Sequence, residues 1–292
     1  MSAIKINVLH PRINTMQHVT PPSGLSHIWL LAKYELSKRF TNKSGMVALI
    51  AFMLIWGILL LYPIKSASEF IMQPSFKELT EALFGPGSLQ HLFEWPVPEL
   101  AVFWLAALYL FPMFSIFIAA DQFSSDKQRG SLRFLTLRVS RSSLFFGRFL
   151  GHMLIQLALI VFTLLATIIM VTSRDISLFV PSLITCVIVM INLVIVLLPY
   201  TAAMAVLSLY ANSARQASIF AIILWAIVSI IIAVINAKFP QLTGLSMILP
   251  GSQISSMINT QGLGSFVFAP VPILQTIVIL TLGNLLMKRS AL

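Results

Sequence analysis

Residues 180–209 read VPSLITCVIVMINLVIVLLPYTAAMAVLSL, without a single Asp, Glu, Lys or Arg. A transmembrane helix needs about 20 predominantly apolar residues, because each residue rises ~1.5 Å through a hydrocarbon layer ~30 Å thick. Five further apolar segments also lack these four residue types: residues 46–62, 100–120, 151–171, 217–235 and 267–287. The pattern therefore predicts six membrane-spanning helices.

The composition excludes an ordinary soluble protein. Of the 292 residues, 58% are hydrophobic and 10% are charged, whereas a soluble domain carries about 25% charged residues. The chain is predicted to be an all-α polytopic membrane protein in which residues 25–292 form a single transmembrane domain. Residues 1–24 lack the apolar centre of a signal peptide, so we expect them to form a cytoplasmic N-terminal arm.

The distribution of basic residues predicts the orientation. With the N-terminus in the cytoplasm, only four of the 19 Lys and Arg residues face the other side: Lys65, Lys77, Arg174 and Lys238. Because Lys and Arg favour cytoplasmic loops, both termini are expected on the cytoplasmic side of a bacterial inner membrane. The net charge of +10 follows from this topology and from anionic lipids. It does not indicate nucleic acid binding, since the cations lack interleaved aromatic residues.

Residues 25–40 predict an amphipathic helix that lies among membrane lipids in the headgroup plane. Its apolar residues recur at helical spacing: Leu25, Ile28, Trp29, Ala32, Leu36 and Phe40. Lys33 lies elsewhere on the helix, and Glu35 and Arg39 are spaced to form an i,i+4 ion pair. Trp29 is expected at the membrane interface. An anchor alone and an anchor that also contacts a cytoplasmic partner both stay open.

The fourth span contains two residues associated with helix bending. Pro199 removes a backbone donor and predicts a kink, and Asn192 precedes it by about two turns on the same face. These two residues are a candidate gate, although a purely structural kink is the alternative. The only cysteine, Cys186, lies in the same span and is expected to pack as a small apolar residue.

Two longer segments are expected on the outer side. Residues 63–98 form the largest outer segment, and residues 236–266 predict short helices that dip into the outer leaflet, since the segment is mostly uncharged and apolar.

The segment DKQRGSLRFLTLRVSR, residues 126–141, is far more charged than its surroundings. Gly130 allows a sharp turn, and Ser131 is a candidate cap for a short cytoplasmic helix over residues 131–139. Leu132, Leu135 and Val139 share one face of that helix. A two-turn helix joined to two spans tilts both when a soluble partner pushes it, so this segment predicts a coupling helix between spans two and three.

The same residues resemble the permeases of the ABC type-2 exporter family. That family often shows an acidic residue four before Gly-Thr/Ser-Leu, then Leu-Leu, Pro-Ile/Val-Ser-Arg and Gly-Lys. The matching residues here are Asp126, Gly130-Ser131-Leu132, Leu135, Val139-Ser140-Arg141 and Gly147-Arg148. Arg138 stands where the family has proline, and Arg148 stands where it has lysine.

The resemblance implies the permease subunit of an ATP-driven exporter. The permease would pair as a homodimer, or with a related permease as a heterodimer, and engage two copies of a separate ABC ATPase. The transport path would lie between the permeases, along the polar faces of spans two and five. The residues implied in contact with the ATPase are Asp126, Arg129, Gly130, Ser131, Leu132, Arg133, Leu135, Arg138, Ser140 and Arg141, with Arg215 in a second, weaker contact.

The chain itself is not expected to be an enzyme or to bind a cofactor. It contains no phosphate-binding Gly-x-x-x-x-Gly-Lys-Ser/Thr loop, so ATP and Mg are expected in the partner ATPase. The five histidines lack metal-ligand spacing and no span contains paired carboxylates, so no metal site or catalytic residue is predicted.

Two other classes fit the sequence less well. A secondary transporter or channel usually places ionisable residues at mid-membrane, whereas the spans offer neutral groups such as Gln156, Asn192 and Tyr200. A non-transporting anchor or transducer on the same fold usually carries a large outer domain, and residues 63–98 are too few for one.

Overall fold

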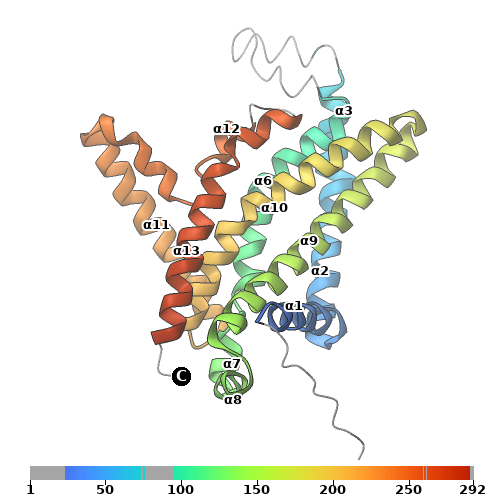
Figure 1. Ribbon diagram of the computed structural model, residues 1–292. Helices are drawn as coiled ribbons and strands as arrows, with labels where there is room; N and C mark the ends of the chain where they lie inside the picture. Colours follow the sequence, from blue (N-terminus) through green and yellow to red (C-terminus); the bar gives the residue numbers. More distant parts are fainter. Residues whose placement is uncertain (1–23, 74, 76–94, 259, 261, 290–292) are drawn as a thin grey trace, which may run out of the picture.

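The computed structural model describes residues 24–73, 75, 95–258, 260 and 262–289, and every element in these ranges is helical (Figure 1). Six helical segments are long and apolar enough to cross a membrane: Gly45–Ile71, Pro98–Gln128, Arg141–Arg174, Ile176–Tyr210, Ala214–Lys238 and Pro270–Arg289. The all-α architecture with six spans is thereby confirmed, and the chain is a multi-pass membrane protein. The predicted arm over residues 1–24 lies outside the described residues except for Gly24.

The first span extends beyond its predicted end at residue 62. Helix α2 (Lys43–Leu59) continues through a π-helical turn, η1 (Leu60–Ile64), into α3 (Lys65–Ile71). Pro63 lies inside the π turn. Proline lacks a backbone N–H, and a π turn changes the hydrogen-bonding register so that the helix continues past it. The start of the predicted outer segment is therefore helix, and residues 74 and 76–94 of that segment lie outside the described residues.

The remaining spans are α6 (Pro98–Ala119), α9 (Arg141–Arg174), α10 (Phe179–Tyr210), α11 (Ala214–Lys238) and α13 (Pro270–Arg289). Helix α9 begins ten residues before its predicted start, because Ser140 caps it by accepting a hydrogen bond from the backbone of Ser143. The sixth span begins at Pro270 and not at Val267, which belongs to the short helix η4 (Gly262–Phe268).

Helices α6, α9 and α10 form the centre of the bundle, and α2 packs on it through aromatic residues. Trp56 of α2 is 1% exposed, and its ring centroid lies 5.0 Å from that of Phe111 and 5.4 Å from that of Phe103, both in α6. Ring pairs at these separations add packing energy beyond the area they bury. These ring contacts therefore help to hold α2 against α6.

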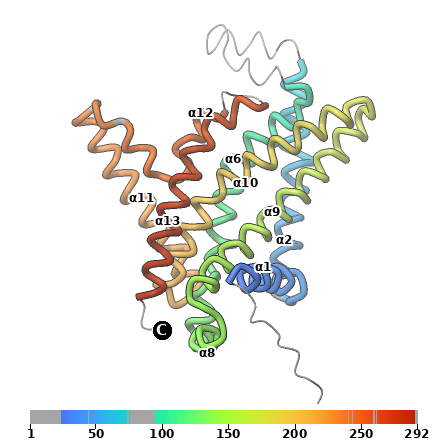
Figure 2. The backbone as a smooth tube through the Cα atoms, viewed as in Figure 1, coloured from blue at the N-terminus to red at the C-terminus, as the bar shows by residue number. Residues whose placement is uncertain are grey.

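The segment after α11 folds back into the bundle (Figure 2). It contains η3 (Pro240–Ile248), α12 (Ile254–Ile258) and η4. The hydroxyl of Tyr200 donates to the carbonyl of Pro250 at 3.1 Å, and Gln275 of α13 donates to the carbonyl of Leu249 at 3.0 Å. Gly251 has a φ of 86°, and a Cβ there would overlap the Tyr200 hydroxyl. These contacts tie the returning segment to spans four and six.

Helix α11 diverges from α13 toward the end of the molecule opposite α8 (Ser131–Arg138) (Figures 1 and 2). Only 17% of its most apolar window is buried within the chain. A cavity of about 350 Å³ lies between α10, α11 and α13, and its lining is almost entirely apolar. The rings of Tyr200 and Trp225 stack in its wall with centroids 5.2 Å apart.

Candidate functional site

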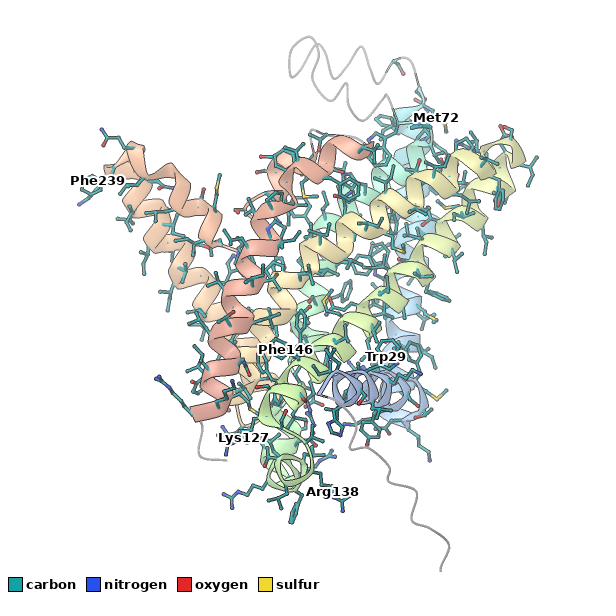
Figure 3. The ribbon with its side chains drawn as sticks, in the orientation of Figure 1. Trp29, Met72, Lys127, Arg138, Phe146 and Phe239 are labelled. Atoms are coloured by element: carbon teal, nitrogen blue, oxygen red, sulfur yellow. The ribbon has the colours of Figure 1, made fainter. Side chains whose placement is uncertain are left out.

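The predicted cytoplasmic turn is a helical hairpin at the base of the bundle. Helix α7 (Ser124–Gln128) has Arg129 as its C-cap residue, Gly130 reverses the chain with a φ of 71°, and α8 follows. A positive φ costs other L-residues energy that glycine avoids, so the turn requires Gly130 or a residue that tolerates this conformation. Lys127 and Arg138 project from the hairpin at this end of the molecule (Figure 3). The predicted turn and short helix are both present, and α8 ends one residue before the predicted Val139.

The predicted capping role of Ser131 is wrong. Gly130 occupies the N-cap position of α8, and no side chain caps the helix there. The Ser131 hydroxyl lies 3.0 Å from a carboxylate oxygen of Asp126 and 3.2 Å from its backbone carbonyl. Ser131 therefore joins α8 to α7 across the turn.

Helix α8 has one face against the bundle and one face toward solvent. Leu132 is 2% exposed and packs with Phe123, Leu144 and Phe145, with Leu135 beside it. The opposite face carries Phe134, which is 73% exposed, and Leu137, which is 83% exposed. The predicted apolar face of Leu132 and Leu135 thus packs toward the permease itself, with Leu132 buried and Leu135 partly exposed. Their contact with the ATPase stays a prediction.

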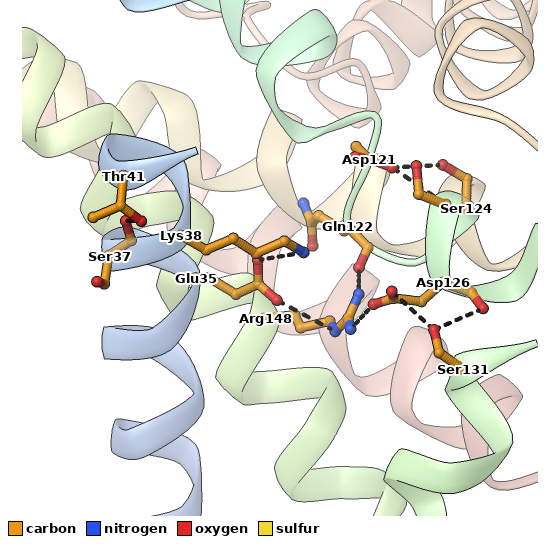
Figure 4. Close-up of polar contacts among 11 residues, drawn as sticks. Glu35, Ser37, Lys38, Thr41, Asp121, Gln122, Ser124, Asp126, Ser131 and Arg148 are labelled. Atoms are coloured by element: carbon orange, nitrogen blue, oxygen red, sulfur yellow. Dashed lines mark hydrogen bonds and ion pairs between the residues drawn. The ribbon is translucent and has the colours of Figure 1, made fainter. Parts of the chain in front are cut away.

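Arg148 lies at the centre of a buried group of charged residues, here called the Arg148 cluster: Glu35, Asp126 and Arg148 (Figure 4). The Arg148 side chain is 5% exposed. Its guanidinium donates to the carboxylate of Asp126 and to the backbone carbonyl of Gln122, and its Nε lies 3.9 Å from a carboxylate oxygen of Glu35. A buried guanidinium needs several acceptors to offset the loss of water. The cluster therefore joins α1 (Gly24–Thr41), the end of α6, α7 and α9.

Helix α1 packs directly against α9. A Cβ added to Gly147 would lie 2.8 Å from the Cβ of Leu31, and one added to Gly151 would lie 2.8 Å from the Cβ of Glu35. Small residues four apart let two helix backbones approach closely.

The contact with α9 changes the predicted roles in α1. Ala32 and Glu35 are its buried residues, whereas Trp29 is 48% exposed with Lys33 Nζ 5.5 Å from its ring. The proposed Glu35–Arg39 pair is wrong, because Glu35 pairs with Lys38 and Arg148 instead. The buried face of α1 is set by contact with α9 and not by the apolar stripe of its sequence.

A second cytoplasmic turn, between α10 and α11, lies against α7. Lys127 Nζ donates to the carbonyls of Leu209 and Tyr210 at 3.1 and 3.2 Å. Cations at a helix C-terminus are favourable because the last carbonyls lack partners within the helix. Arg215 follows this turn and is exposed.

Arg141 binds the C-terminal end of the last span, as Lys127 binds that of α10. Its Nη1 donates to the carbonyl of Lys288 at 2.9 Å, at the end of α13. Arg141 thus holds two helices of the permease together at this end, and its predicted contact with the ATPase stays a prediction.

The family model described as "ABC-2 family transporter protein" matches residues 29–286, from α1 to α13. The chain belongs to this family. A search of curated proteins gave no match. Proteins of the ABC-2 family are membrane subunits of ABC transporters, and the family implies an ABC ATPase as partner.

In this ABC-2 permease, the sequence predicted the α7–α8 hairpin but did not single out two of its residues and one residue of α9. Phe134 and Leu137 are the most exposed apolar side chains of the hairpin, and Arg148 is its main attachment to α9. The signal for Arg148 was present, because a basic residue within a long apolar helix needs a buried partner.

One group of polar side chains within the spans of the ABC-2 permease lies inside the subunit. Thr201 of α10 accepts a hydrogen bond from Gln156 at 2.9 Å, and Ser115 of α6 lies 3.3 Å away. Ser115 is 1% exposed in the single chain, and a path along the polar faces of spans two and five stays a prediction. The exposed side chains of α6 are apolar: Tyr109, Met113 and Phe117.

The two candidate gate residues are also buried. Asn192 donates to the carbonyl of Ile188 in its own helix at 3.0 Å, and α10 continues through Pro199 as one element. Their role as a gate stays a prediction. Among the residues that the structure describes, no group of three or more His, Cys, Asp or Glu side chains is placed to hold a metal ion.

Proposed function

We propose that this ABC-2 permease is the membrane subunit of an exporter, and that α8 seats in a groove of a separate ABC ATPase. The observation that carries the proposal is the outer face of α8, where Phe134 and Leu137 are exposed beside Arg133 and Arg138. Exposed apolar side chains surrounded by cations suit an apolar pocket with an acidic rim. With α8 in the cytoplasm, both termini and α1 lie on that side of the inner membrane.

The way α8 is attached supports its proposed role in transmitting movement. Leu132 packs under it, and Asp126 links it through Ser131 and Arg148 to α9. A force applied to α8 by closure of the ATPases would therefore move α6 and α9 together, as rigid helices moving about an interface. The free energy for the movement would come from ATP and Mg bound by the partner.

We further propose that two permease chains pair, identical or related, and that two ATPase copies bind below them. The apolar stripe Tyr109, Met113 and Phe117 on α6 lies at positions four apart and is about half exposed, with accessibilities of 58%, 55% and 50%. Helix α11 is the least buried span. Both surfaces suit helix contacts with a second permease.

The cargo we propose is apolar or amphipathic. The cavity of about 350 Å³ between α10, α11 and α13 falls within the size range of small-molecule sites. Its walls carry aromatic and aliphatic side chains, with the Tyr200 hydroxyl already bonded to Pro250. A charged cargo would find no counter-ion in this lining.

The coupling proposal is tested by co-purification with a co-expressed ABC ATPase and by ATPase assays in proteoliposomes. We expect Phe134→Glu and Leu137→Glu to abolish co-purification or to reduce transport-linked ATP hydrolysis at least tenfold. Ile176→Glu is the matched control, because Ile176 is 76% exposed at the opposite end of the molecule. Normal association and coupling in both α8 variants would refute the proposal.

A further inference from the structure

A polar cavity of about 110 Å³ lies where α1, α2, α7 and α9 meet. Its basic and neutral polar lining comes from Lys38, Arg39 and Asn42 at the end of α1, Ser125 and Arg129 of the hairpin, and His152 of α9. Gly45 closes one side, and a Cβ there would overlap the carbonyl oxygen of Arg39. The cavity therefore lies at the depth where the first span begins.

The carboxylates in this cavity already have partners. Glu35 lies near Lys38 and Arg148, and Asp126 accepts from Arg148. Asp121 accepts from the backbone N–H of Ser125 at 3.2 Å.

Two cations and one ring nitrogen in the cavity lack such partners. Within the described ranges, Arg39 and Arg129 form no ion pair with an acidic residue. The Nδ1 atom of His152 is buried and has no hydrogen-bond partner there, although the residue is 5% exposed. With Arg148 included, four cations surround the cavity against three carboxylates, and Arg39 and Arg129 are the two that have no ion-pair partner in the described part of the chain. The cavity thus has an excess of one positive charge and an unused buried polar atom.

An apolar groove of about 250 Å³ continues from the polar cavity and shares Arg39 and Ile155 with it. Its α2 wall runs from Ala48 to Ile55, and its other walls include Phe114 of α6 and Leu159 of α9. From Ala48 to Ile55 a helix rises about 10 Å, which is about two thirds of one leaflet of a hydrocarbon core ~30 Å thick. The groove therefore runs through much of the depth of one leaflet.

We propose that the two spaces together bind one anionic phospholipid. Its phosphate would lie between Arg39 and Arg129, and one acyl chain would fill the groove along Ala48 and Phe114. A small anion would occupy only the polar cavity, and an uncharged amphiphile would occupy only the groove. An anionic lipid has a charged headgroup for the polar cavity and an acyl chain for the groove, which lies deeper in the membrane. The lipid would join α1, α2 and the hairpin. This inference uses the orientation of the proposed function, with the site in the inner leaflet.

Native mass spectrometry of the detergent-purified full chain tests this site without an ATPase, so its outcome is independent of coupling. We expect phosphatidylglycerol to bind in preference to phosphatidylcholine. Arg39→Gln and Arg129→Gln should each weaken binding of phosphatidylglycerol about fivefold, the effect of ~1 kcal/mol for a basic side chain near an anionic lipid surface. Lys238→Gln, which removes a cation at the end of α11 distant from α1, should leave binding unchanged.

The acyl groove has its own test. Ala48→Phe should fill the groove and weaken binding of phosphatidylglycerol, whereas Ala233→Phe on the exposed side of α11 should not. Inorganic phosphate is the second probe, and it should give less than a tenth of the thermal stabilisation that the lipid gives. Equal stabilisation by phosphate would identify a site for a free anion only. Equal binding of the two lipids, or unchanged binding in both arginine variants, would overturn the proposal.

Discussion

The guanidinium of Arg148 in α9 donates to the carboxylate of Asp126 in α7, two side chains that are 5% and 14% exposed. Removing one member of a buried ion pair costs about 3–5 kcal/mol, because the other charge is left without its partner. Arg148→Gln should therefore lower the free energy of unfolding by about 3 kcal/mol or more, since it leaves Asp126 without its ion-pair partner and Glu35 with Lys38 alone.

A double-mutant cycle with Asp126→Asn and Arg148→Gln measures the interaction energy between the two side chains. The free energy of unfolding of each variant is obtained by SDS titration in mixed micelles. We expect an interaction energy of about 1–3 kcal/mol, as for other residues in one network. The exposed pair Lys65–Glu69, with both side chains 57% exposed, is the control and should couple by less than about 1 kcal/mol. Equal coupling of the two pairs would contradict a structural role for Arg148.

The contact of α1 with α9 predicts opposite effects at different glycines. Gly147→Ala and Gly151→Ala place a Cβ 2.8 Å from the side chain of Leu31 or Glu35, and such overpacking costs about 1–3 kcal/mol. Gly57→Ala has open space and should stabilise α2 by up to about 1 kcal/mol. The midpoint of thermal unfolding in detergent should therefore be higher for Gly57→Ala than for the native chain, and lower for the other two variants. If the contact between α1 and α9 did not contribute to stability, the three variants would give similar unfolding curves.

Gly130 predicts an effect of backbone conformation alone, because a Cβ there has no heavy atom within 4 Å. Alanine at a φ of 71° costs about 1–2 kcal/mol, whereas asparagine tolerates the left-handed region better. Gly130→Ala should therefore reduce stability and coupling to the ATPase more than Gly130→Asn. The comparison uses unfolding in detergent and ATPase assays in proteoliposomes, and equal losses in the two variants would point to another cause.

The sequence predicted the spans because uncharged apolar segments of this length are stable only in the hydrocarbon core of a membrane. It also predicted the hairpin, because Gly130 separates two charged, helical stretches. It did not predict which face of α8 is free, since Leu132 and Phe134 are both apolar and periodicity alone does not show which one meets the bundle. The packing of Leu132 against the bundle determines which face of α8 is exposed.

The Arg148 cluster and the position of α1 depend on contacts between distant segments. Asp126 and Arg148 are 22 positions apart, and Glu35 belongs to another helix. The apolar stripe of residues 25–40 predicted a lipid-facing helix, but Gly147 and Gly151 offer a surface on which Ala32 and Glu35 fit. No local pattern in α1 contains that information.

The apolar cavity predicts how cargo affects ATP hydrolysis. Ala203 lines the cavity, so Ala203→Phe should fill it and reduce the stimulation of ATPase activity by apolar compounds at least fivefold. Leu54→Trp, on the exposed side of α2, is the control for added volume in a span. The basal activity of the complex should stay within twofold of normal in both variants. Unchanged stimulation in Ala203→Phe would place the cargo outside this cavity.

Pairing of two permeases through α6 predicts a specific cross-link. Cys186 is the only cysteine, so Cys186→Ala gives a cysteine-free chain in which each introduced cysteine is the only site for cross-linking. Met113→Cys lies in the exposed stripe of α6, and Ile58→Cys in α2 has a similar exposure of the native residue, 59% against 55%. With a short bismaleimide in native membranes, Met113→Cys should give a species of twice the 32.4 kDa chain, or join a related permease. Because Ile58 is not part of the proposed α6 contact, Ile58→Cys should stay monomeric, and the reverse pattern would move the interface from α6 to α2.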